Sequence, residues 1–578
     1  MNSTYQSKFW CFAMSIAFSM MLICLPATSQ TNPNFGANVL IFDTSMSNTT
    51  IQSNLDMIFH QQARNEFGTN RYAIFFKPGQ YSLDINVGFY TQVLGLGQAP
   101  DDVTINGSLH SEGRSARHIA LVNFTRSAEN VSVIPTNDNP ITWAVSQGTS
   151  LRRVHIKGNL NLANTNGGAW SSGGFLADSK IDFRVNSLTQ QQWFSRNDTW
   201  ESWIGHNWNM VFVGTSNPPS GTWPEIPYTV ITNTPLIREK PYLSMDKSGN
   251  YIVMVPSLQT NSLGITWATK CTPAVPVSID RFYLAQEGVD NAATLNAALR
   301  AGKNLIFTPG IYHLTNSILV SRPETIILGL GFATLIPDAG TPSMVISDVS
   351  GVKLAGLIFD AGAIRTPSLL QVGGVGSSSD HSNEPIFLYD LVMRVGGAAS
   401  GTTTSCLVIN ANNVVGDNLW LWRADHGQGV GWNQNACNNG LVVNGDDVTI
   451  YGLFVEHHEQ YQTLWNGNGG QVYFYQCELP YDAPSQTEWS HDSVNGYAAY
   501  KVTDSVTNHQ AYGLGIYGVF TKTTTKCFSS IETPTTPGIN LHHLVDIWIT
   551  GQSGTEITHL LNGMGNPVNS SNRKSALN

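Results

Sequence analysis

A repeated string near the start of each half of the chain constrains the fold more than any other feature. The motif FKPGxY at 76–81 recurs as FTPGxY at 307–312, and LGLG at 94–97 recurs at 328–331. A helical stretch precedes each copy, Ile51–Gln62 in the first and DNAATLNAALRAGKN in the second. Self-similarity over roughly 230 residues indicates that a whole domain has been duplicated. The LGLG strings fit neither phosphate-loop pattern and are interpreted as turns.

Short β-like runs follow each copy, and in the second half they recur about every 20–35 residues. A helix, a Pro-Gly turn and successive β-runs are typical of the beginning of a right-handed parallel β-helix. Charged residues are only 12% of the chain and Gly is abundant at 53 residues, which favours stacked short strands with many turns over a helical bundle. We therefore expect an all-β chain with two tandem right-handed parallel β-helix domains of the pectate-lyase-like kind, packed side by side.

The domain limits follow from shifts in composition along the chain. The N-terminus resembles a secretory signal, with Lys8, an apolar stretch over Phe9–Leu25 and a small-residue cleavage site, so 1–29 is interpreted as a signal peptide. A membrane anchor is the alternative. The remaining predicted segments are an N-terminal β-helix domain at 30–214, a Pro-rich connecting segment at 215–285 and a C-terminal β-helix domain at 286–578. We expect a secreted, extracellular protein.

Glycosylation sequons are compatible with an exported glycoprotein and occur at Asn48, Asn106, Asn123, Asn130, Asn197 and Asn569. Beyond the predicted signal, five cysteines remain at Cys271, Cys406, Cys437, Cys477 and Cys527. Their number predicts one or two disulfides and at least one free thiol. Cys477 is interpreted as a buried small hydrophobe. With no CxxC or Cys/His spacing, no metal and no cofactor are expected.

The formal charge of −10, without basic runs, gives no footprint for nucleic acid or for an acidic membrane. A neutral polymer such as a glucan suits this balance better than a polyanion such as pectate. We expect no nucleic-acid partner, no membrane association after signal cleavage, and a monomer.

Three β-like runs in the second half are each followed closely by an acidic residue: 419–422 by Asp425, 448–455 by Glu456 and 472–475 by Glu478. If these runs stack as rungs about 4.8 Å apart, the carboxylates gather on one face. The aromatic residues expected around them are Trp422, Trp432, Trp465 and Tyr475. Clustered carboxylates repel, so at least one keeps its proton near neutral pH. Carboxylates among aromatic faces are what a glycosidase requires.

Each of these residues also has an ordinary structural interpretation. Glu456 and Glu478 can be solvated loop residues, and Asp425 can form an ion pair with Arg423. The pair Asp446-Asp447 is interpreted as a turn. His426, His457 and His458 lack a metal-binding spacing such as HExxH.

The strings WAVSQ, SGGFLAD, RADHG, NGDDV, LFVEH and ELPYD, in this order, resemble the bacterial-type branch of glycoside hydrolase family 55. Members of this family are exo-acting β-1,3-glucanases, or laminarinases, and the resemblance extends from about Phe35 to Val568. It implies an active site between two β-helices and hydrolysis with inversion, releasing glucose from the non-reducing end. By the same resemblance, Glu478 is the general acid, Gln147 and Ser172 position the attacking water, Glu456 belongs to the relay that accepts its proton, and Asp425 lines the pocket. The substrate-binding candidates are Trp422, Trp432, Trp465, Tyr475 and His426.

Elementary chemistry supports a carboxylate in the relay, because Gln and Ser orient a water but do not accept its proton at neutral pH. Glu456 is the first candidate for this base and Asp425 the second. An inverting pair needs carboxyl groups roughly 6.5–9.5 Å apart. Other β-helix functions stay open: a polygalacturonase, for which only a DD pair is present; a lyase, for which only Arg423 lies near the carboxylates; or an inactive carbohydrate-binding or surface protein.

Overall fold

The computed structural model describes residues 33–113, 118–165, 168–268 and 274–578. The predicted signal peptide and Cys271 lie outside these residues. Asn34–Asn578 form one compact unit. Within the described part of the chain, no helix combines the length and hydropathy needed to cross a bilayer.

The first half forms a stack of parallel strands that begins with β1, and helix α1 (Asn48–Gln62) follows β1 in the chain. Its main sheet follows the order β1-β2-β4-β6-β8-β10-β12-β14-β15, and the remaining strands form the other faces of the coils. The strands are β1 (Val39–Phe42), β2 (Tyr72–Phe76), β3 (Gly79–Asn86), β4 (Thr91–Gly95), β5 (Val103–His110), β6 (Arg126–Pro135), β7 (Ile141–Thr142), β8 (Ser150–Ile156), β9 (Leu160–Asn161), β10 (Phe175–Ala177), β11 (Lys180–Asn186), β12 (Gln192–Arg196), β13 (Thr199–Ile204), β14 (Asn209–Val213) and β15 (Tyr228–Ile231).

The second half forms a longer stack that begins with β21 and helix α2 (Ala292–Arg300). One sheet contains β21 (Phe282–Ala285), β22 (Asn304–Phe307), β23 (Ile311–Leu314), β25 (Ile326–Gly329), β26 (Thr334–Pro337), β28 (Lys353–Ala355), β29 (Ile358–Asp360), β31 (Ile386–Val395), β33 (Val414–Arg423), β35 (Thr449–Glu456), β37 (Gly470–Glu478), β41 (His509–Phe520), β43 (Ile539–Gly551) and β45 (Lys574–Leu577). A second sheet contains β24 (Ile318–Val320), β27 (Met344–Ile346), β30 (Thr366–Val372), β32 (Thr403–Ile409), β34 (Cys437–Val443), β36 (Thr463–Trp465), β40 (Tyr500–Val502), β42 (Lys526–Glu532) and β44 (Glu556–Leu561). A hairpin of β38 (Ser490–His491) and β39 (Val494–Asn495) projects from this stack.

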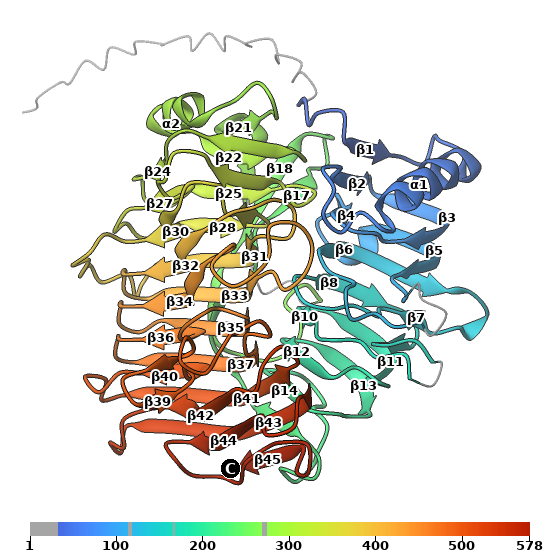
Figure 1. Cartoon of the computed structure of the whole chain (residues 1–578). Helices are drawn as coiled ribbons and strands as arrows, with labels where there is room; N and C mark the ends of the chain where they lie inside the picture. Colours follow the sequence, from blue (N-terminus) through green and yellow to red (C-terminus); the bar gives the residue numbers. More distant parts are fainter. Residues whose placement is uncertain (1–32, 114–117, 166–167, 269–273) are drawn as a thin grey trace, which may run out of the picture. The chain divides into compact units, whose positions relative to one another are not determined.

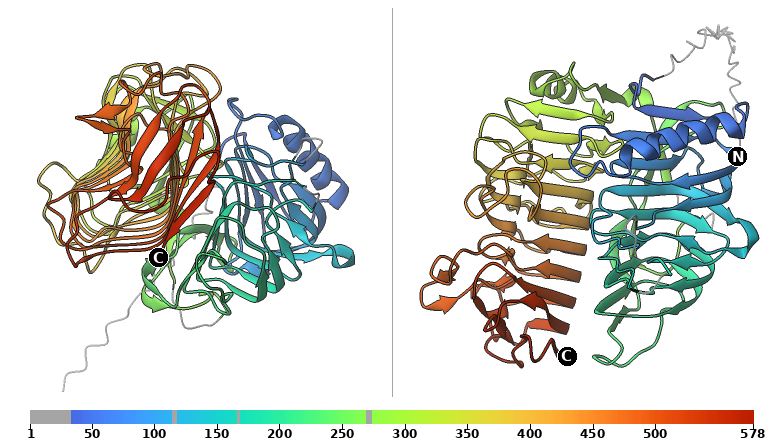
Figure 2. Two further views of the ribbon diagram at one scale, coloured as in Figure 1. Left: turned by 60° about the horizontal axis from the view of Figure 1, so that its bottom comes forward. Right: turned by 45° about the vertical axis from the view of Figure 1, so that its right-hand side comes forward.

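Figures 1 and 2 show the two stacks side by side, the first in blue to cyan and the second in yellow to red. Nearly all strand pairs within them are parallel; the final pair, β43 with β45, is antiparallel. The prediction of an all-β chain with two tandem parallel β-helices is therefore confirmed.

The two copies of the repeated motif adopt the same local structure. In the first, the Tyr81 hydroxyl donates to the carbonyl of Lys77 at 2.7 Å. In the second, the Tyr312 hydroxyl donates to the carbonyl of Thr308 at 2.9 Å. Helix α1 begins three residues before the predicted start, because the Ser47 side chain caps it by accepting from the Thr50 amide.

Residues 234–281 connect the stacks and pack on both. They contain β16 (Thr234–Arg238) paired with β19 (Leu258–Ser262), and β18 (Tyr251–Pro256) between β17 (Tyr242–Met245) and β20 (Ala274–Ser278). Tyr242 donates to the carbonyl of Gln98 in the first stack at 2.9 Å. From the second stack, Tyr451 donates to the carbonyl of Leu236 at 3.0 Å. Strand β15, inside the predicted connecting segment 215–285, extends the sheet of the first stack.

Equivalent residues on successive rungs stack on one another to form the core of the second stack. One ladder of buried residues runs through Leu391, Leu419, Leu453, Tyr475, Leu514 and Leu544, each paired with the next. Stacking apolar side chains in this way buries them without any helix covering the sheet. The described cysteines Cys406, Cys437, Cys477 and Cys527 are all free thiols, so the expected disulfides do not form among the described residues. Cys477 lies in the core, as predicted.

A buried ionic network joins the two stacks. Arg196 of β12 contacts Asp417 of β33 at 2.9 Å and Glu239 of the connecting segment at 2.6 Å. Arg152 of β8 contacts Asp417 at 2.7 Å and Asp390 of β31 at 2.8 Å. Arg196 and Asp417 are fully buried, so each charge depends on its partners for compensation.

Replacing Asp417 by Ala should destabilise the protein strongly, because two buried guanidinium groups lose a shared carboxylate. Removal of one partner from a buried pair costs about 3–5 kcal/mol. The Lys526→Ala variant is the control, since it removes a more exposed pair with Glu556 at 2.8 Å, worth about 0–1 kcal/mol. Urea denaturation should show a large fall in the midpoint for Asp417→Ala alone. Equal midpoints for the two variants would contradict this account.

Candidate active site

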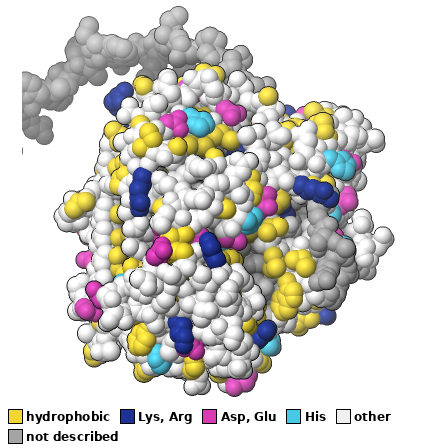
Figure 3. Space-filling model, in the orientation of Figure 1, with side chains coloured by type: hydrophobic (Ala, Val, Ile, Leu, Met, Phe, Trp, Pro, Cys, Tyr) yellow, Lys and Arg dark blue, Asp and Glu magenta, His cyan; other side chains and the backbone are white. Residues whose placement is uncertain are grey.

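A cavity of about 340 Å³ lies between the two stacks. The first stack contributes Leu121, Val122, Phe124, Gln147, Ser172 and Gln191, and the second contributes Trp422, Asp425, His426, Glu456, His457, Glu478, Tyr481, Val519 and Ile549. Acidic, histidine and apolar side chains lie side by side near the middle of the face shown in Figure 3. All five predicted catalytic residues line this one cavity, although Gln147 and Glu456 are more than 300 positions apart.

Register places the two glutamates on neighbouring rungs. Glu456 at the end of β35 pairs with Glu478 at the end of β37, and the residue of β33 on the same row is Trp422. Asp425 lies three residues beyond that row, in the loop that follows β33. The predicted gathering of carboxylates is thus found, with Asp425 at the side of the row and not on it.

Glu456 is almost fully buried and held by three side chains. Its Oε1 accepts hydrogen bonds from Gln147 and Gln476, each at 2.8 Å, and its Oε2 accepts from the Trp420 indole at 2.8 Å. Burial raises the pKa of Glu456, and the negative charge of Asp425 raises it further. The three donors oppose this rise, and the resulting pKa is about 7.

Glu478 faces the cavity next to Glu456. Its Oε2 accepts a hydrogen bond from the Tyr481 hydroxyl, and Gln476 lies 3.4 Å from its Oε1. Burial, followed by the negative charges of Glu456 and Asp425, raises the pKa of Glu478 well above its usual range. Of the two register partners, Glu478 is therefore the one that retains its proton, which is the state required of a general acid.

One hydrogen-bond donor lies close to both glutamates. Nε2 of Gln476 is 2.8 Å from Glu456 Oε1 and 3.4 Å from Glu478 Oε1. These two oxygens are consequently no more than about 6 Å apart. The strands pair directly at this position, which brings the two side chains to neighbouring rungs.

Gln147 connects the stacks at the cavity. Its Nε2 lies 3.3 Å from the Ser172 hydroxyl and 2.8 Å from Glu456. With Nε2 directed at these two acceptors, the carbonyl oxygen of Gln147 is the atom left to accept a hydrogen bond from a water. Both residues come from the first stack and meet the carboxylates of the second.

Asp425 and His426 form an ionic cluster at the rim with Glu66 from the first stack. His426 contacts Asp425 at 2.9 Å through Nδ1 and Glu66 at 2.7 Å through Nε2. Burial opposes the imidazolium, but hydrogen bonds to these two carboxylates outweigh it and raise the pKa of His426 to about 10. Burial likewise opposes ionisation of Asp425, yet the hydrogen bond from His426 and the charge of His457 hold its pKa at about 2.

Aromatic rings form one wall of the cavity. Trp422 stacks on Trp420 with centroids 4.9 Å apart and lies 5.6 Å from Phe124 of the first stack. Phe67 also stacks on Trp422, at 6.1 Å. Trp422 and His426 both line the cavity, but Trp422 is almost fully buried among these rings.

The structure corrects three predicted substrate-binding residues, Trp432, Trp465 and Tyr475, none of which lines the cavity. Tyr475 belongs to the core ladder, where its hydroxyl donates to the carbonyl of Ala499 at 2.8 Å. Trp465 is fully buried and packs edge-on against His509. Trp432 packs against the core with Arg423 over its ring. The sequence places these three rings near the carboxylates but does not show whether each ring faces the cavity or the core.

Several residues of the site are not predicted from the sequence. Phe124, Glu66 and Gln191 come from loops of the first stack that no motif marks. Gln476 has a usable signal, because it lies two residues before Glu478 and so points to the same side of β37. Tyr481 and Trp420 lie near the carboxylates in the sequence, but only the structure shows that they donate hydrogen bonds to Glu478 and Glu456.

The alternative interpretations are also resolved for particular residues. Arg423 pairs with Asp482 at 2.8 Å and lies buried, so the suggested pair with Asp425 does not form. Asp446 and Asp447 lie in a turn, as predicted, where Asp446 accepts from the Asn468 amide at 2.7 Å.

Comparison with known proteins places this site among carbohydrate-active enzymes. The family described as LAM55 pectate lyase-like domain matches residues 282–478. The chain is 43% identical over 538 residues to an exo-beta-1,3-glucanase from Streptomyces sp. (strain SirexAA-E / ActE), covering 93% of this chain and 87% of that protein. The structure of sacteLam55A from Streptomyces sp. SirexAA-E matches with a TM-score of 0.91 and 42% identity, covering 94% of this chain and 98% of that one. A variant of sacteLam55A in complex with glucose matches with the same values.

Replacing Glu66 by Gln should lower the pKa of His426 below about 10, because one of its two carboxylate partners loses its charge. The measurement is a pH titration of histidine ring resonances by NMR, with His426 assigned from their loss in His426→Gln. Glu112→Gln is the matched control, since that carboxylate pairs with His110 at 3.2 Å. An unchanged titration of His426 in Glu66→Gln would show that Glu66 does not stabilise the imidazolium.

Proposed function

The chain belongs to glycoside hydrolase family 55, and we propose that it is an exo-acting β-1,3-glucanase that releases glucose from the non-reducing end of laminarin-type glucans with inversion. The observation that carries the proposal is the pairing of Glu456 with Glu478 at one cavity, where Gln147 from the other stack hydrogen-bonds Glu456. The printed activity of the Streptomyces relative and the glucose complex of sacteLam55A support the choice of substrate.

Glu478 acts as the general acid. Burial and two neighbouring carboxylates favour its protonated form, and Tyr481 fixes the orientation of its carboxyl group. As the glycosidic bond breaks, Glu478 gives its proton to the leaving oxygen, which prevents a poor alkoxide leaving group from forming. The loss of that proton produces a carboxylate beside the oxocarbenium-like sugar, an arrangement that stabilises the developing positive charge.

The water is held by Gln147 and Ser172, and Glu456 accepts its proton. Glu456 is poorly suited to be a nucleophile, because Oε1 already accepts two hydrogen bonds and Oε2 accepts one. One lone pair of Oε2 stays available for a proton. The charge that Glu456 carries when ionised is stabilised by the same three donors, so it serves better as the final proton acceptor.

Gln147 and Ser172 extend the site toward the first stack, where a water can approach the opposite face of the sugar ring. The three hydrogen bonds that Glu456 already accepts leave it poorly placed to bond to the sugar. This arrangement favours direct displacement by water, with inversion, over a covalent intermediate on Glu456.

A polyuronate lyase fits the site less well. Such an enzyme needs a basic side chain near the anionic sugar, and Arg423 is buried in its pair with Asp482. Of the three carboxyl groups in the cavity lining, Asp425 is ionised and would repel a uronate.

Export to the extracellular space is part of the proposal and rests on the signal-like N-terminus and on a substrate that is a polymer. Three of the sequons are unsuited to carry glycans in the folded protein. Asn123, Asn130 and Asn197 are buried, and the amide nitrogen of each donates to backbone carbonyls. Glycosylation would therefore fall on Asn48, Asn106 or Asn569, whose side chains are at least partly exposed.

Replacing Glu478 by Gln should lower turnover of laminarin by about 10²–10⁴-fold, because the proton donor is lost while the shape is kept. The products of the unaltered protein, followed by NMR, should appear first as α-glucose. Glu201→Gln, an exposed position on β13, is the control and should keep full activity. Near-normal turnover in a folded Glu478→Gln protein would refute the assignment, and early β-glucose would refute inversion.

Replacing Asp425 by Asn should move the alkaline limb of the kcat/KM profile to lower pH. Asp425 is one of the two negative charges that raise the pKa of Glu478, so its removal makes ionisation of Glu478 easier. The acid form is then lost at a lower pH. Asp446→Asn, in a turn outside the cavity, should leave the profile unchanged, and an unmoved limb in Asp425→Asn would show that Asp425 does not act on Glu478.

A further inference from the structure

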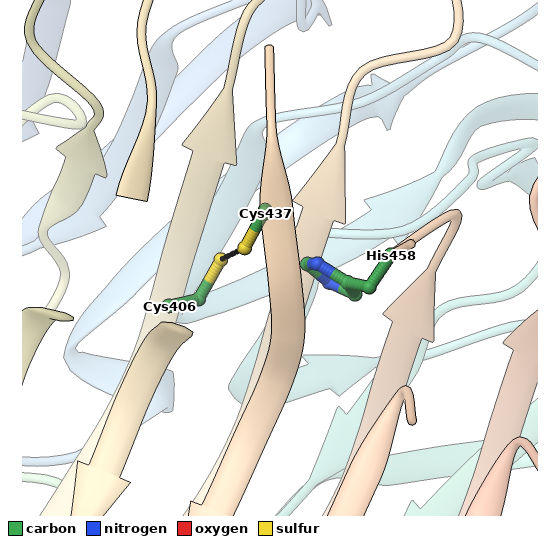
Figure 4. A group of neighbouring side chains, drawn as sticks. All are labelled: Cys406, Cys437 and His458. Atoms are coloured by element: carbon green, nitrogen blue, oxygen red, sulfur yellow. Dashed lines mark hydrogen bonds between the residues drawn. The ribbon is translucent and has the colours of Figure 1, made fainter. Parts of the chain in front are cut away.

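Two cysteines and a histidine meet in the core of the second stack, outside the catalytic cavity. Cys406 belongs to β32, Cys437 begins β34 on the next rung, and His458 follows β35 by two residues. The two Sγ atoms are 3.8 Å apart, and one ligand atom from each of the three residues lies within 4.8 Å of the others. All three residues are fully buried, and Figure 4 shows them converging.

The imidazole of His458 is fixed with one nitrogen unused. Its Nε2 contacts the carbonyl of Leu421 at 3.1 Å, and its backbone is locked by Gln462, which bonds both the amide and the carbonyl at 2.7 Å. With Nε2 bound to a carbonyl, Nε2 carries the hydrogen and Nδ1 presents a lone pair. Among the described residues, Nδ1 has no hydrogen-bond partner. An unpartnered polar atom at such depth costs about 1–3 kcal/mol, so its retention needs a reason.

The backbone leaves room for this ring. Gly440 lies beside the imidazole, and an added Cβ there would come within 2.7 Å of His458 Nε2 and 2.3 Å of Val455. A side chain at this position would clash with the imidazole. The absence of a side chain at 440 therefore leaves space for the ring where it lies, beside Cys406 and Cys437.

We propose that Cys406, Cys437 and His458 form a buried binding site for a thiophilic d¹⁰ cation, with Zn²⁺ as the representative ion. Two thiolates on one tetrahedral Zn²⁺ at about 2.3 Å lie about 3.8 Å from each other, which is the separation observed. A disulfide would need the sulfurs at about 2.0 Å and gives no role to the free Nδ1. On binding, both thiols release their protons to solvent, and the two thiolates balance the charge of the ion.

The ion would stabilise the fold next to the catalytic row and take no part in the reaction. His458 follows Glu456 and His457, both of which line the cavity, whereas none of the three ligands does. Binding would tie the end of β35 to β32 and β34 through the core. The site does not depend on the proposed function, since none of its three residues lines the cavity.

The test is the metal content of the whole protein produced with added Zn²⁺ and dialysed against EDTA to remove surface-bound metal. Mass spectrometry of the metal should find about one Zn²⁺ per chain. Cys406→Ser and Cys437→Ser should lose it. Cys527→Ser is the matched control, because that thiol is equally buried in the same core but lies apart from the cluster, and should retain the metal.

A cobalt-loaded preparation of the unaltered protein provides a second measurement that needs no variant. Thiolate ligation should give intense sulfur-to-cobalt absorption in the near ultraviolet. The proposal is overturned by a spectrum without that absorption, by a metal-free protein, or by zinc retained in both Ser variants. Non-reducing peptide mapping that finds Cys406 cross-linked to Cys437 would equally overturn it.

Discussion

The catalytic arrangement depends on the buried ionic contact between the two stacks. Asp417 is shared by Arg152 and Arg196, and Glu239 from the connecting segment completes the compensation of Arg196. Charges at this depth are tolerated only with their partners in place, so the network fixes how the stacks face each other. Gln147 precedes the strand of Arg152 by a few residues, and that fixed relation brings its amide to Glu456.

Parallel stacking gives the site its chemistry. Because each rung repeats the register of the one before, two glutamates at equivalent strand ends must lie side by side. Burial, together with the neighbouring negative charges, raises the pKa of Glu478 well above its usual range and that of Glu456 to about 7, where three hydrogen-bond donors oppose the rise. The parallel register that stacks apolar residues into a ladder a few positions away therefore also places two carboxyl groups of different pKa side by side.

The first stack supplies what the row of glutamates lacks. Gln147 and Ser172 place polar groups beside Glu456, and Phe124 packs against Trp422. Glu66 holds His426 from the same side. Duplication of the β-helix thus produced one copy that carries the acid groups and another that completes their surroundings.

The sequence by itself determined the repeated β-helix and predicted that Glu456 and Glu478 gather at one place, because these follow from local patterns and ordered motifs. Through family resemblance it also predicted that Gln147 and Ser172 belong to the same cavity, which they line. It did not determine which aromatic residues face the cavity: Tyr475 and Trp465 turned inward, since the side of a rung that a ring occupies depends on packing with neighbouring coils. The meeting of Cys406, Cys437 and His458 was likewise decided by the tertiary structure, because it depends on contacts between different rungs, and no spacing along the chain encodes such contacts.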